Sequence, residues 1–237
     1  MQPTPVLLPG NMCDARLWTA DVRNVLTGAV DGDLTQDDSI AEMATRVLLA
    51  TDGDLLPVGF SMGAIVAVEM AVQAPERIAG LVLTGYNATA DLTERAAHRP
   101  VQQVEVRAGG LERVLVEELK PNYLAAKNRS DKALLDLLRD MGLGLGTDVF
   151  IRQSEALRLR KDRRADIAAL KVPVLYLCGK DDTLCPPAWH QQWAAQTPRA
   201  HFEEVTGAGH MLPLEAPDKF VKIIEQWLIN CEGEFRV

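Results

Sequence analysis

The residues most able to do chemistry in this sequence are Ser61, Asp182 and His210, which follow one another in that order. A serine hydroxyl is a weak nucleophile until a base removes its proton. A histidine can take that proton near neutral pH and return it to a leaving group. An aspartate can hold the imidazole in the required tautomer and stabilise its cation. Together the three residues could form and hydrolyse a covalent acyl intermediate.

The serine lies in residues 59–63, whose sequence GFSMG matches the pattern G-x-S-x-G. An apolar run precedes this segment, and a nearly all-apolar helical pattern follows at 64–74. A serine on a sharp strand-to-helix turn needs small neighbours because the backbone packs closely there. The helix also places N–H groups where negative charge is stabilised. This context favours a nucleophile over an ordinary glycine-rich turn.

A tetrahedral acyl intermediate also needs hydrogen-bond donors for its oxyanion. The backbone N–H of Met62, directly after the serine, is one candidate. The second donor should come from the loop after the first strand, at residues 9–12. We expect the backbone N–H of Asn11 to supply it, with Met12 as the alternative. One such donor is worth a factor of about 10² to 10³ in turnover.

The elements that must position these residues alternate between strand and helix patterns. Asp182 and His210 follow the last two strand patterns, and loops at such strand ends gather the catalytic groups of parallel α/β sheets. We therefore expect an α/β fold with a mainly parallel sheet of about six strands, flanked by helices. The strand patterns lie at 6–8, 25–30, 55–58, 78–84, 172–178 and 202–205, and a further helix pattern at 40–50 can be capped by Ser39.

Residues 88–165 interrupt this alternation with helical patterns and no convincing strand. We predict a helical cap there, and a catalytic core made of residues 1–87 and 166–237. The glycine-rich run at 141–146 lacks the preceding strand and the spacing of a nucleotide loop, so we interpret it as a turn between cap helices. The cap helix patterns lie at 111–119, 132–141 and 149–159.

The 237 residues suit one α/β domain with a modest insertion. A formal charge of −8 argues against a general nucleic-acid binder. No apolar stretch approaches the length that crosses a membrane, and the N-terminus shows no secretory signal pattern. We expect a cytoplasmic protein whose partner is a small-molecule ester, without a nucleic-acid or membrane partner; nothing in the sequence indicates the oligomeric state.

The predicted cap is richer in positive charge than the rest of the chain. It carries 15 Lys and Arg against 12 Asp and Glu, whereas the remaining residues carry 10 against 21. A basic cap could favour an anionic substrate or an acidic carrier protein. A solvated helix end is the alternative. Much of the excess comes from Arg160, Lys161, Arg163 and Arg164.

Other chemistry-bearing residues give weaker signals. The four cysteines match no zinc spacing, and we expect reduced thiols and no metal site. His98, in the insertion, could contact the substrate, whereas His190 and His201 lie in polar, surface-like sequence and are interpreted as structural. Cys13 and Cys185 closely follow the predicted catalytic loops; the other two cysteines are Cys178 and Cys231.

The chain resembles the α/β-hydrolase superfamily, in particular its small microbial carboxylesterase-like members. The resemblance is carried by residues 7–10 with 16–18, by the Ser61, Asp182 and His210 segments, and by 150–153 in the insertion. It implies hydrolysis of esters or related acyl compounds without a cofactor. Family-like spacing favours Asp182 over the adjacent Asp181. Family members often have His-Gly where this chain has residues 9–10, Pro-Gly, so a side chain that commonly braces the oxyanion loop is missing.

We predict a serine carboxylesterase for small or medium acyl groups. Cleavage of a thioester, a lactone, a carbon–carbon bond or an N-terminal peptide bond on the same fold is the alternative, and a non-catalytic ligand receptor is a third. The residues that could line the substrate pocket are Met12, Trp18 and Met211, although ordinary core packing also accounts for each of them.

Overall fold

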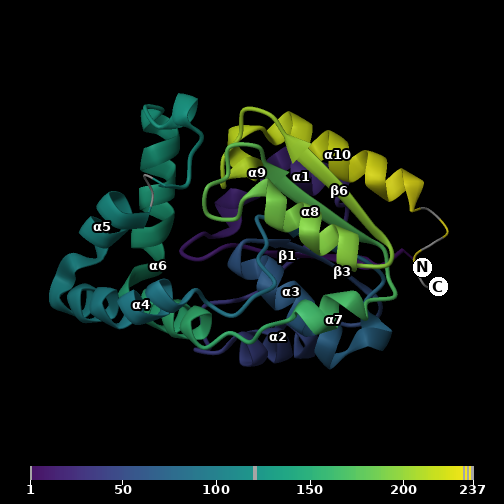
Figure 1. The fold of residues 1–237 in the computed structure, drawn as a ribbon, viewed down its shortest axis with the longest axis horizontal. Coiled ribbons are helices and arrows are strands. Elements are labelled where there is room, and N and C mark those ends of the chain that lie inside the picture. The colour runs from purple at the N-terminus through teal and green to yellow at the C-terminus, as the bar shows by residue number, and fades with distance from the viewer. Residues whose placement is uncertain (1, 120–121, 232, 234, 236–237) are drawn as a thin grey trace.

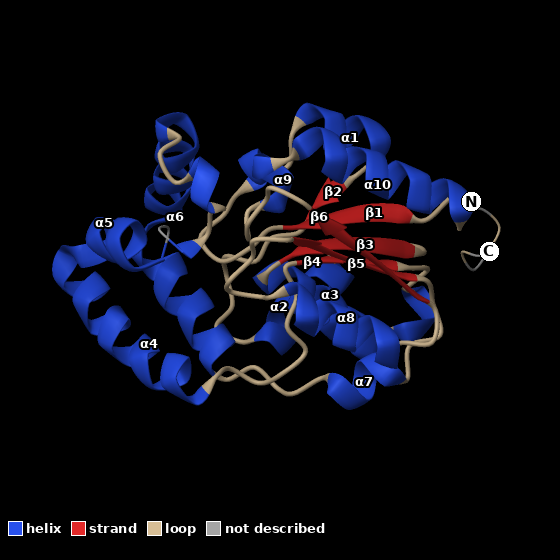
Figure 2. Ribbon diagram, turned by 45° about the horizontal axis from the view of Figure 1, so that its top comes forward, coloured by secondary structure: helices blue, strands red, loops and turns tan. Residues whose placement is uncertain are grey.

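The computed structural model describes residues 2–119, 122–231, 233 and 235. Within these residues one parallel sheet has the strand order β2-β1-β3-β4-β5-β6. Helices surround this sheet (Figures 1 and 2). The expected α/β-hydrolase fold with about six strands is confirmed. The strands are β1 (Thr4–Leu8), β2 (Val30–Asp31), β3 (Leu55–Phe60), β4 (Leu81–Thr84), β5 (Val174–Gly179) and β6 (Ala200–Val205).

The centre of the sheet is apolar because helices cover both of its faces. Every residue of β3, β4 and β5 is buried, which parallel strands covered on two sides require. Helices α2, α3, α7 and α8 lie on one face, and α1, α9 and α10 on the other (Figure 2). Their bounds are α1 (Ala20–Val25), α2 (Ile40–Leu49), α3 (Met62–Gln73), α7 (Arg164–Ala168), α8 (Pro187–Gln196), α9 (Leu212–Glu215) and α10 (Pro217–Asn230), with single 3-10 turns at η1 (Ala15–Leu17) and η2 (Pro75–Arg77).

The strand predicted at 25–30 is mostly wrong. Val25 ends α1, and β2 contains only Val30 and Asp31. Thr19 caps α1 by accepting a hydrogen bond from the N–H of Val22 at 3.4 Å. Between the two elements Gly28 takes a φ of 77°, which breaks the apolar run. The short strand that remains lies at the edge of the sheet, paired only with β1.

The described elements from α4 to α6, between β4 and β5, are helical and lie to one side of the sheet (Figure 1). One cap helix, α4, has no predicted counterpart, because no side chain caps its start and Pro100 lies inside it. The division into a core and a cap stays a prediction. The elements of this region are α4 (Thr93–Glu105), η3 (Val106–Gly110), α5 (Leu111–Arg113), η4 (Val114–Leu119), η6 (Ala126–Asn128) and α6 (Lys132–Arg158).

Helix α6 joins the two helix patterns predicted at 132–141 and 149–159. The glycine-rich run between them contains the predicted break, because two helical segments that share the label α6 meet there at a kink. Only Gly146 leaves the helical conformation, with φ 83° and ψ 178°, and it bends the element. This bend lets the second half of α6 return toward the core.

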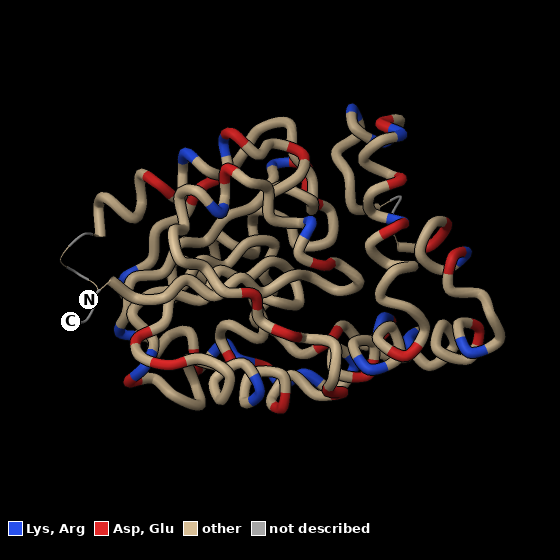
Figure 3. Tube along the Cα trace, turned by 180° about the vertical axis from the view of Figure 1, so that it is seen from behind, with Lys and Arg blue, Asp and Glu red and all other residues tan. Residues whose placement is uncertain are grey.

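None of the helices in the described part of the chain is long and apolar enough to cross a bilayer. Charges of both signs are interspersed along the cap (Figure 3). The basic run at 160–164 is mostly paired. Arg160 lies 2.9 Å from Asp91, Arg163 pairs with Glu69, and Arg164 lies 2.6 Å from Asp162. This run therefore does not form a broad basic face.

Candidate active site

Ser61 occupies a strained turn between β3 and α3. Its φ of 52° and ψ of −113° are rare for a residue with a side chain. The glycines of the GFSMG segment allow this turn. A Cβ at Gly59 would lie 2.5 Å from the Cα of Ala64, and one at Gly63 would lie 2.0 Å from the carbonyl oxygen of Leu8. Only hydrogen fits at both positions, which is the close packing that the sequence pattern predicted.

Three loops at the carboxyl end of the sheet bring Ser61, Asp182 and His210 together. The Oγ atom of Ser61 lies 3.0 Å from Nε2 of His210. Nδ1 of the same ring lies 2.8 Å from Oδ2 of Asp182. The arrangement is consistent with an Nδ1–H that donates to the carboxylate and an Nε2 that accepts from the serine hydroxyl. The imidazole then has its basic nitrogen directed at the serine.

The carboxylate of Asp182 is held by more than the histidine. Its Oδ1 accepts hydrogen bonds from the backbone N–H groups of Leu184 and Cys185, at 2.8 and 2.9 Å. Burial would raise the pKa of Asp182, but the charge and hydrogen bond of His210 and the N–H of Cys185 bring this pKa below its usual value. Asp181 is exposed, so the structure places Asp182 beside the imidazole, as the spacing from Gly179 favoured.

The imidazole of His210 is confined on several sides. The rings of Phe60 and Tyr123 lie 5.1 and 5.7 Å from it, centroid to centroid. Gly85, with a φ of 60°, passes so close that a Cβ there would lie 2.9 Å from Cε1 of the ring. The ring is therefore positioned by packing as well as by its hydrogen bonds.

Glu215, which the sequence analysis missed, holds the histidine loop in place. Its Oε1 accepts from the N–H groups of Gly209 and Met211, at 2.9 and 3.1 Å. Its Oε2 accepts from the N–H of Ala125 at 2.8 Å. Glu215 thus joins the loop on either side of His210 to a cap segment 90 residues away in sequence. Two of these partners are six and four residues away, but the third is 90 residues away, and no motif in the sequence marked Glu215.

The loop after β1 contains the two residues considered for the second oxyanion donor, Asn11 and Met12. The N–H of Met12 donates to Oε1 of Gln153 at 2.9 Å, so it is not available for an oxyanion. Asn11 and Met62 instead line a cavity together with Ser61. Among the described residues, neither of their backbone N–H groups donates to a protein acceptor. The geometry therefore favours the backbone N–H of Asn11, rather than that of Met12, as the second oxyanion donor.

Gln153 braces this loop from the cap. Its Oε1 accepts from the side-chain amide of Asn11 at 3.1 Å as well as from Met12, and its Nε2 donates to the carbonyl of Leu34 at 3.1 Å. The side chain is almost fully buried, at 1% exposure. It supplies a brace where Pro9 replaces the histidine common in the family. The resemblance at 150–153 marked the segment, but not this role.

A cavity of about 680 Å³ opens over the serine, lined by the core loops and by cap residues of α4, η4 and α6. His98 lines it, but the three residues predicted to line the pocket do not. Met12 packs against apolar cap residues such as Phe150, Trp18 stacks on Phe220, and Met211 is buried in the core. Their apolar side chains are used for packing, and the lining that remains mixes charged side chains with apolar ones such as Ile65 and Leu157.

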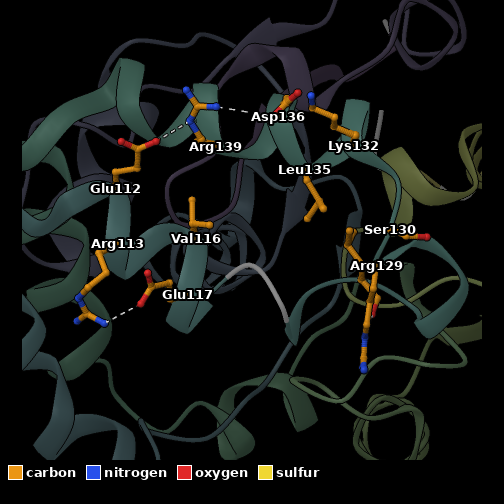
Figure 4. Close-up of a pocket in the computed structure, with 11 residues that line it drawn as sticks. Glu112, Arg113, Val116, Glu117, Arg129, Ser130, Lys132, Leu135, Asp136 and Arg139 are labelled. Atoms are coloured by element: carbon orange, nitrogen blue, oxygen red, sulfur yellow. Dashed lines mark hydrogen bonds and ion pairs between the residues drawn. The ribbon is translucent and has the colours of Figure 1, made fainter.

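A second cavity, of about 770 Å³, lies within the cap between α5, η4 and α6 (Figure 4). Ion pairs such as Arg139 with Glu112, at 2.9 Å, border it together with Val116 and Leu135. The described residues that line it include no histidine and no cysteine. The cavity over Ser61 is therefore the one that combines space with a nucleophile and a base.

The other histidines have structural contacts. His190 is fully buried, not surface-like as predicted; its Nε2 accepts from the N–H of Tyr86 at 2.8 Å, and Nδ1 lies 3.3 Å from the carbonyl oxygen of Pro186. Burial lowers the pKa of His190 to about 4, so the ring is neutral. His201 is exposed and lies 2.8 Å from Glu203.

The four cysteines are all buried. Burial raises the pKa of the Cys178 thiol to about 12, and burial together with the charge of Asp182 raises that of Cys185. Both are therefore protonated at neutral pH, which argues against a nucleophilic role. No group of three or more metal-ligating side chains gathers among the described residues.

The fold is that of an α/β hydrolase, and Ser61, Asp182 and His210 lie where its sheet ends. The sequence profile of the Alpha/beta hydrolase family matches residues 6–223, and the chain belongs to that family. The resemblance recognised in the sequence is confirmed.

Individual proteins extend the comparison. "Putative carbamate hydrolase RutD" of Serratia proteamaculans is 26% identical over 216 residues, covering 87% of this chain and 79% of the relative. An esterase from Thermogutta terrifontis has the same fold, with a TM-score of 0.88 and 24% identity over 97% of this chain and 90% of that one. An enol-lactonase from Burkholderia xenovorans also has this fold, with a TM-score of 0.82 and 21% identity over 97% of this chain and 92% of that one. At these identities the two structures show the fold alone.

Proposed function

We propose that this hydrolase cleaves carboxylic esters of small or medium acyl groups through a covalent acyl-enzyme. The observation that carries the proposal is the continuous line of hydrogen bonds from Asp182 through His210 to Ser61, beside a cavity large enough for a small ester. Ser61 is the nucleophile, His210 the general base and acid, and Asp182 the residue that orients the imidazole.

Each step needs only groups that the chain supplies. The Ser61 Oγ attacks the ester carbonyl while Nε2 of His210 takes its proton. The tetrahedral intermediate collapses, the alcohol leaves with that proton, and the acyl group stays on Ser61. Water then attacks the acyl-enzyme, His210 again carries the proton, and the carboxylic acid is released. The backbone N–H groups of Asn11 and Met62 donate to the oxyanion in both tetrahedral intermediates.

The bond that is cleaved is the finer part of the proposal. The relatives are named a carbamate hydrolase, an esterase and an enol-lactonase, and all of these reactions transfer an acyl or carbamoyl group. Esters come first because the chain resembles carboxylesterase-like members of the family and an esterase shares its fold; the three residues themselves would serve any of these acyl groups. Thioesters, lactones, carbamates, carbon–carbon bonds and N-terminal peptide bonds belong in the same substrate panel, and faster turnover of one of them would replace the ester assignment.

Labelling with a small fluorophosphonate, together with hydrolysis of 4-nitrophenyl esters of increasing acyl length, tests the proposal. We expect labelling and turnover in the wild type and neither in Ser61→Ala. Ser130→Ala is the matched control, since Ser130 is an exposed cap serine outside any such turn, and it should keep both. Absence of labelling and of turnover across the whole panel in the folded wild type would support the non-catalytic receptor instead.

A further inference from the structure

The cavity over Ser61 contains a cation for which the protein provides no counterion. Arg95, on α4, lines this cavity together with Ser61 and His210 and is half-buried. Among the described residues its guanidinium makes no hydrogen bond and no ion pair. Removing a cation from bulk water has a free-energy cost unless a partner compensates for it. A partner for Arg95 would have to arrive with the ligand.

The two other arginines of the cavity are already neutralised in part. Nε of Arg99 lies 2.6 Å from one oxygen of Asp91, and Nη1 of Arg160 lies 2.9 Å from the other. The Asp91 side chain is 1% exposed. Two cations therefore share one buried carboxylate, and this cluster keeps a net positive charge next to Arg95.

The acidic residues that line the cavity do not cancel this charge. Glu118 accepts a hydrogen bond from Gln102 at 2.8 Å and pairs with Arg113 at 2.6 Å. These hydrogen bonds lower the pKa of Glu118 to about 2, so it remains an ionised partner of the Arg113 guanidinium, a cation that Glu105 and Glu117 share. Even with Glu118 counted as an uncompensated anion, the three arginines of the cavity exceed Asp91 and Glu118 by one positive charge. Glu94 is exposed on α4 beside Arg95, where water screens its charge. The less exposed side of the cavity keeps a positive balance.

The charge of Arg95 reaches the catalytic end of the cavity. Burial and the charge of Asp182 raise the pKa of the Cys185 thiol, and the positive charges of Arg95 and Arg160 oppose that rise. Cys185 is the residue whose N–H binds the Asp182 carboxylate. The electrostatic effect agrees with the shared cavity in placing Arg95 within range of a small substrate bound at Ser61.

We propose that this cavity binds an ester that carries a carboxylate on its acyl or alcohol part, and that Arg95 pairs with that carboxylate. The inference rests on the proposed ester hydrolysis. A guanidinium presents parallel N–H donors that match the two oxygens of a carboxylate. One unpaired arginine suits a monoanion, whereas a phosphate dianion would need a second cation, and Arg99 and Arg160 are already engaged with Asp91.

Two pairs of substrates that differ only in charge test the proposal. The first is mono-4-nitrophenyl adipate with its methyl ester, in which the acyl part carries the carboxylate. The second is 4-acetoxybenzoate with methyl 4-acetoxybenzoate, in which the alcohol part carries it. In at least one pair we expect the charged ester to have the higher kcat/KM. Arg95→Gln should lower that charged-to-neutral ratio about tenfold, and added salt should lower it in the wild type.

Two control variants separate charge recognition from damage to the fold. Arg95→Lys keeps the charge and should retain part of the preference. Glu94→Gln changes the neighbouring charge on the same helix and should leave the ratio unchanged or raise it. A ratio that is the same in Arg95→Gln and in the wild type would overturn the inference while leaving ester hydrolysis intact. Failure of all four esters and of fluorophosphonate labelling in the folded wild type would instead overturn the proposed function.

Discussion

Charged groups are held in different ways in two regions of the molecule, the catalytic end of the core on the one hand and the cap on the other. At the catalytic end, main-chain groups hold the carboxylates. Two N–H groups bind Asp182, and those of Gly209 and Met211 bind Glu215 on either side of His210, with a further N–H from Ala125 of the cap. In the cap, side chains pair with side chains, as Arg99 and Arg160 do with Asp91. Main-chain geometry depends on the whole fold, whereas side-chain pairs change with single substitutions. Under the proposed function, the reacting groups therefore depend on the core, and we expect substitutions in the cap to change the choice of substrate.

Gln153 is where the two regions meet. It belongs to cap helix α6, yet it binds the loop after β1 and the carbonyl of Leu34. Arg152 beside it donates to the carbonyl of Thr35 at 2.7 Å. The cap is therefore connected by hydrogen bonds to the loop that carries the proposed oxyanion donor.

The largest effect should come from the core, with Asp182→Asn. An amide would present an N–H to the imidazole and favour the wrong tautomer, so kcat should fall about 10⁴-fold while the protein stays folded. Steady-state kinetics and circular dichroism measure the two quantities. Asp181→Asn, at the exposed neighbouring carboxylate, should retain nearly full activity. Equal losses in the two variants would mean that the acid has been assigned to the wrong aspartate.

A smaller effect on stability should follow at the junction of cap and core. Nε of Arg163 donates to Glu69 of α3 at 3.0 Å, and both side chains are largely buried. Arg163→Met should lower the free energy of unfolding by about 3 kcal/mol in urea titrations, because it leaves Glu69 without its cation. Arg164→Met removes an exposed partner of Asp162 and should cost nothing measurable. Comparable losses would show that burial does not distinguish the two pairs.

The buried histidine of the core should make stability depend on pH. The folded pKa of His190 is about 4, below the ordinary value of 6.5, because burial disfavours the charged ring. The unfolded chain binds a proton as pH falls below 6.5, and the folded protein does not until about pH 4. Stability should therefore decrease by about 2 kcal/mol between pH 6.5 and 5 from this group.

Urea unfolding at several pH values checks this decrease, and His190→Asn should show a shallower slope than the wild type. His98→Asn, which changes an exposed histidine of the cap, serves as the comparison. If both variants alter the slope equally, burial at His190 is not its cause.

The smallest effect should come from the connection between the regions. Gln153→Met keeps the volume but removes the acceptor for Asn11 and Met12, so the oxyanion donor should move and kcat should fall about 10- to 30-fold. KM should change little, because the donor acts mainly in the transition state. Gln103→Met is the control, since Gln103 is a buried cap glutamine that bonds Ser154 and Glu155 instead. An unchanged kcat in Gln153→Met would show that the hydrogen bonds of Gln153 do not position the oxyanion donor.

Local signals predicted much of the fold. Ser39 caps α2 as expected, its Oγ accepting from the N–H of Glu42 at 3.2 Å, and the apolar runs became the buried central strands. The failures also have local causes. Gly28 interrupts the apolar run at 25–30, which was predicted to be one strand. Helix α4 was not predicted because it contains Pro100 and no side chain caps its start. Such elements are stabilised by packing rather than by their own sequence.

The sequence by itself determined the nucleophile turn, the order of Ser61, Asp182 and His210, and the class of the fold. These features depend on tight backbone packing and apolar runs, which are visible within a few residues. Only the tertiary structure decided that Gln153 braces Met12, 141 residues away, and that Glu215 connects the histidine loop to Ala125, 90 residues away. It also decided that Arg95 is left unpaired beside the serine. Such pairings join side chains to partners that only the folded chain brings within hydrogen-bond distance, so no spacing in the sequence encodes them.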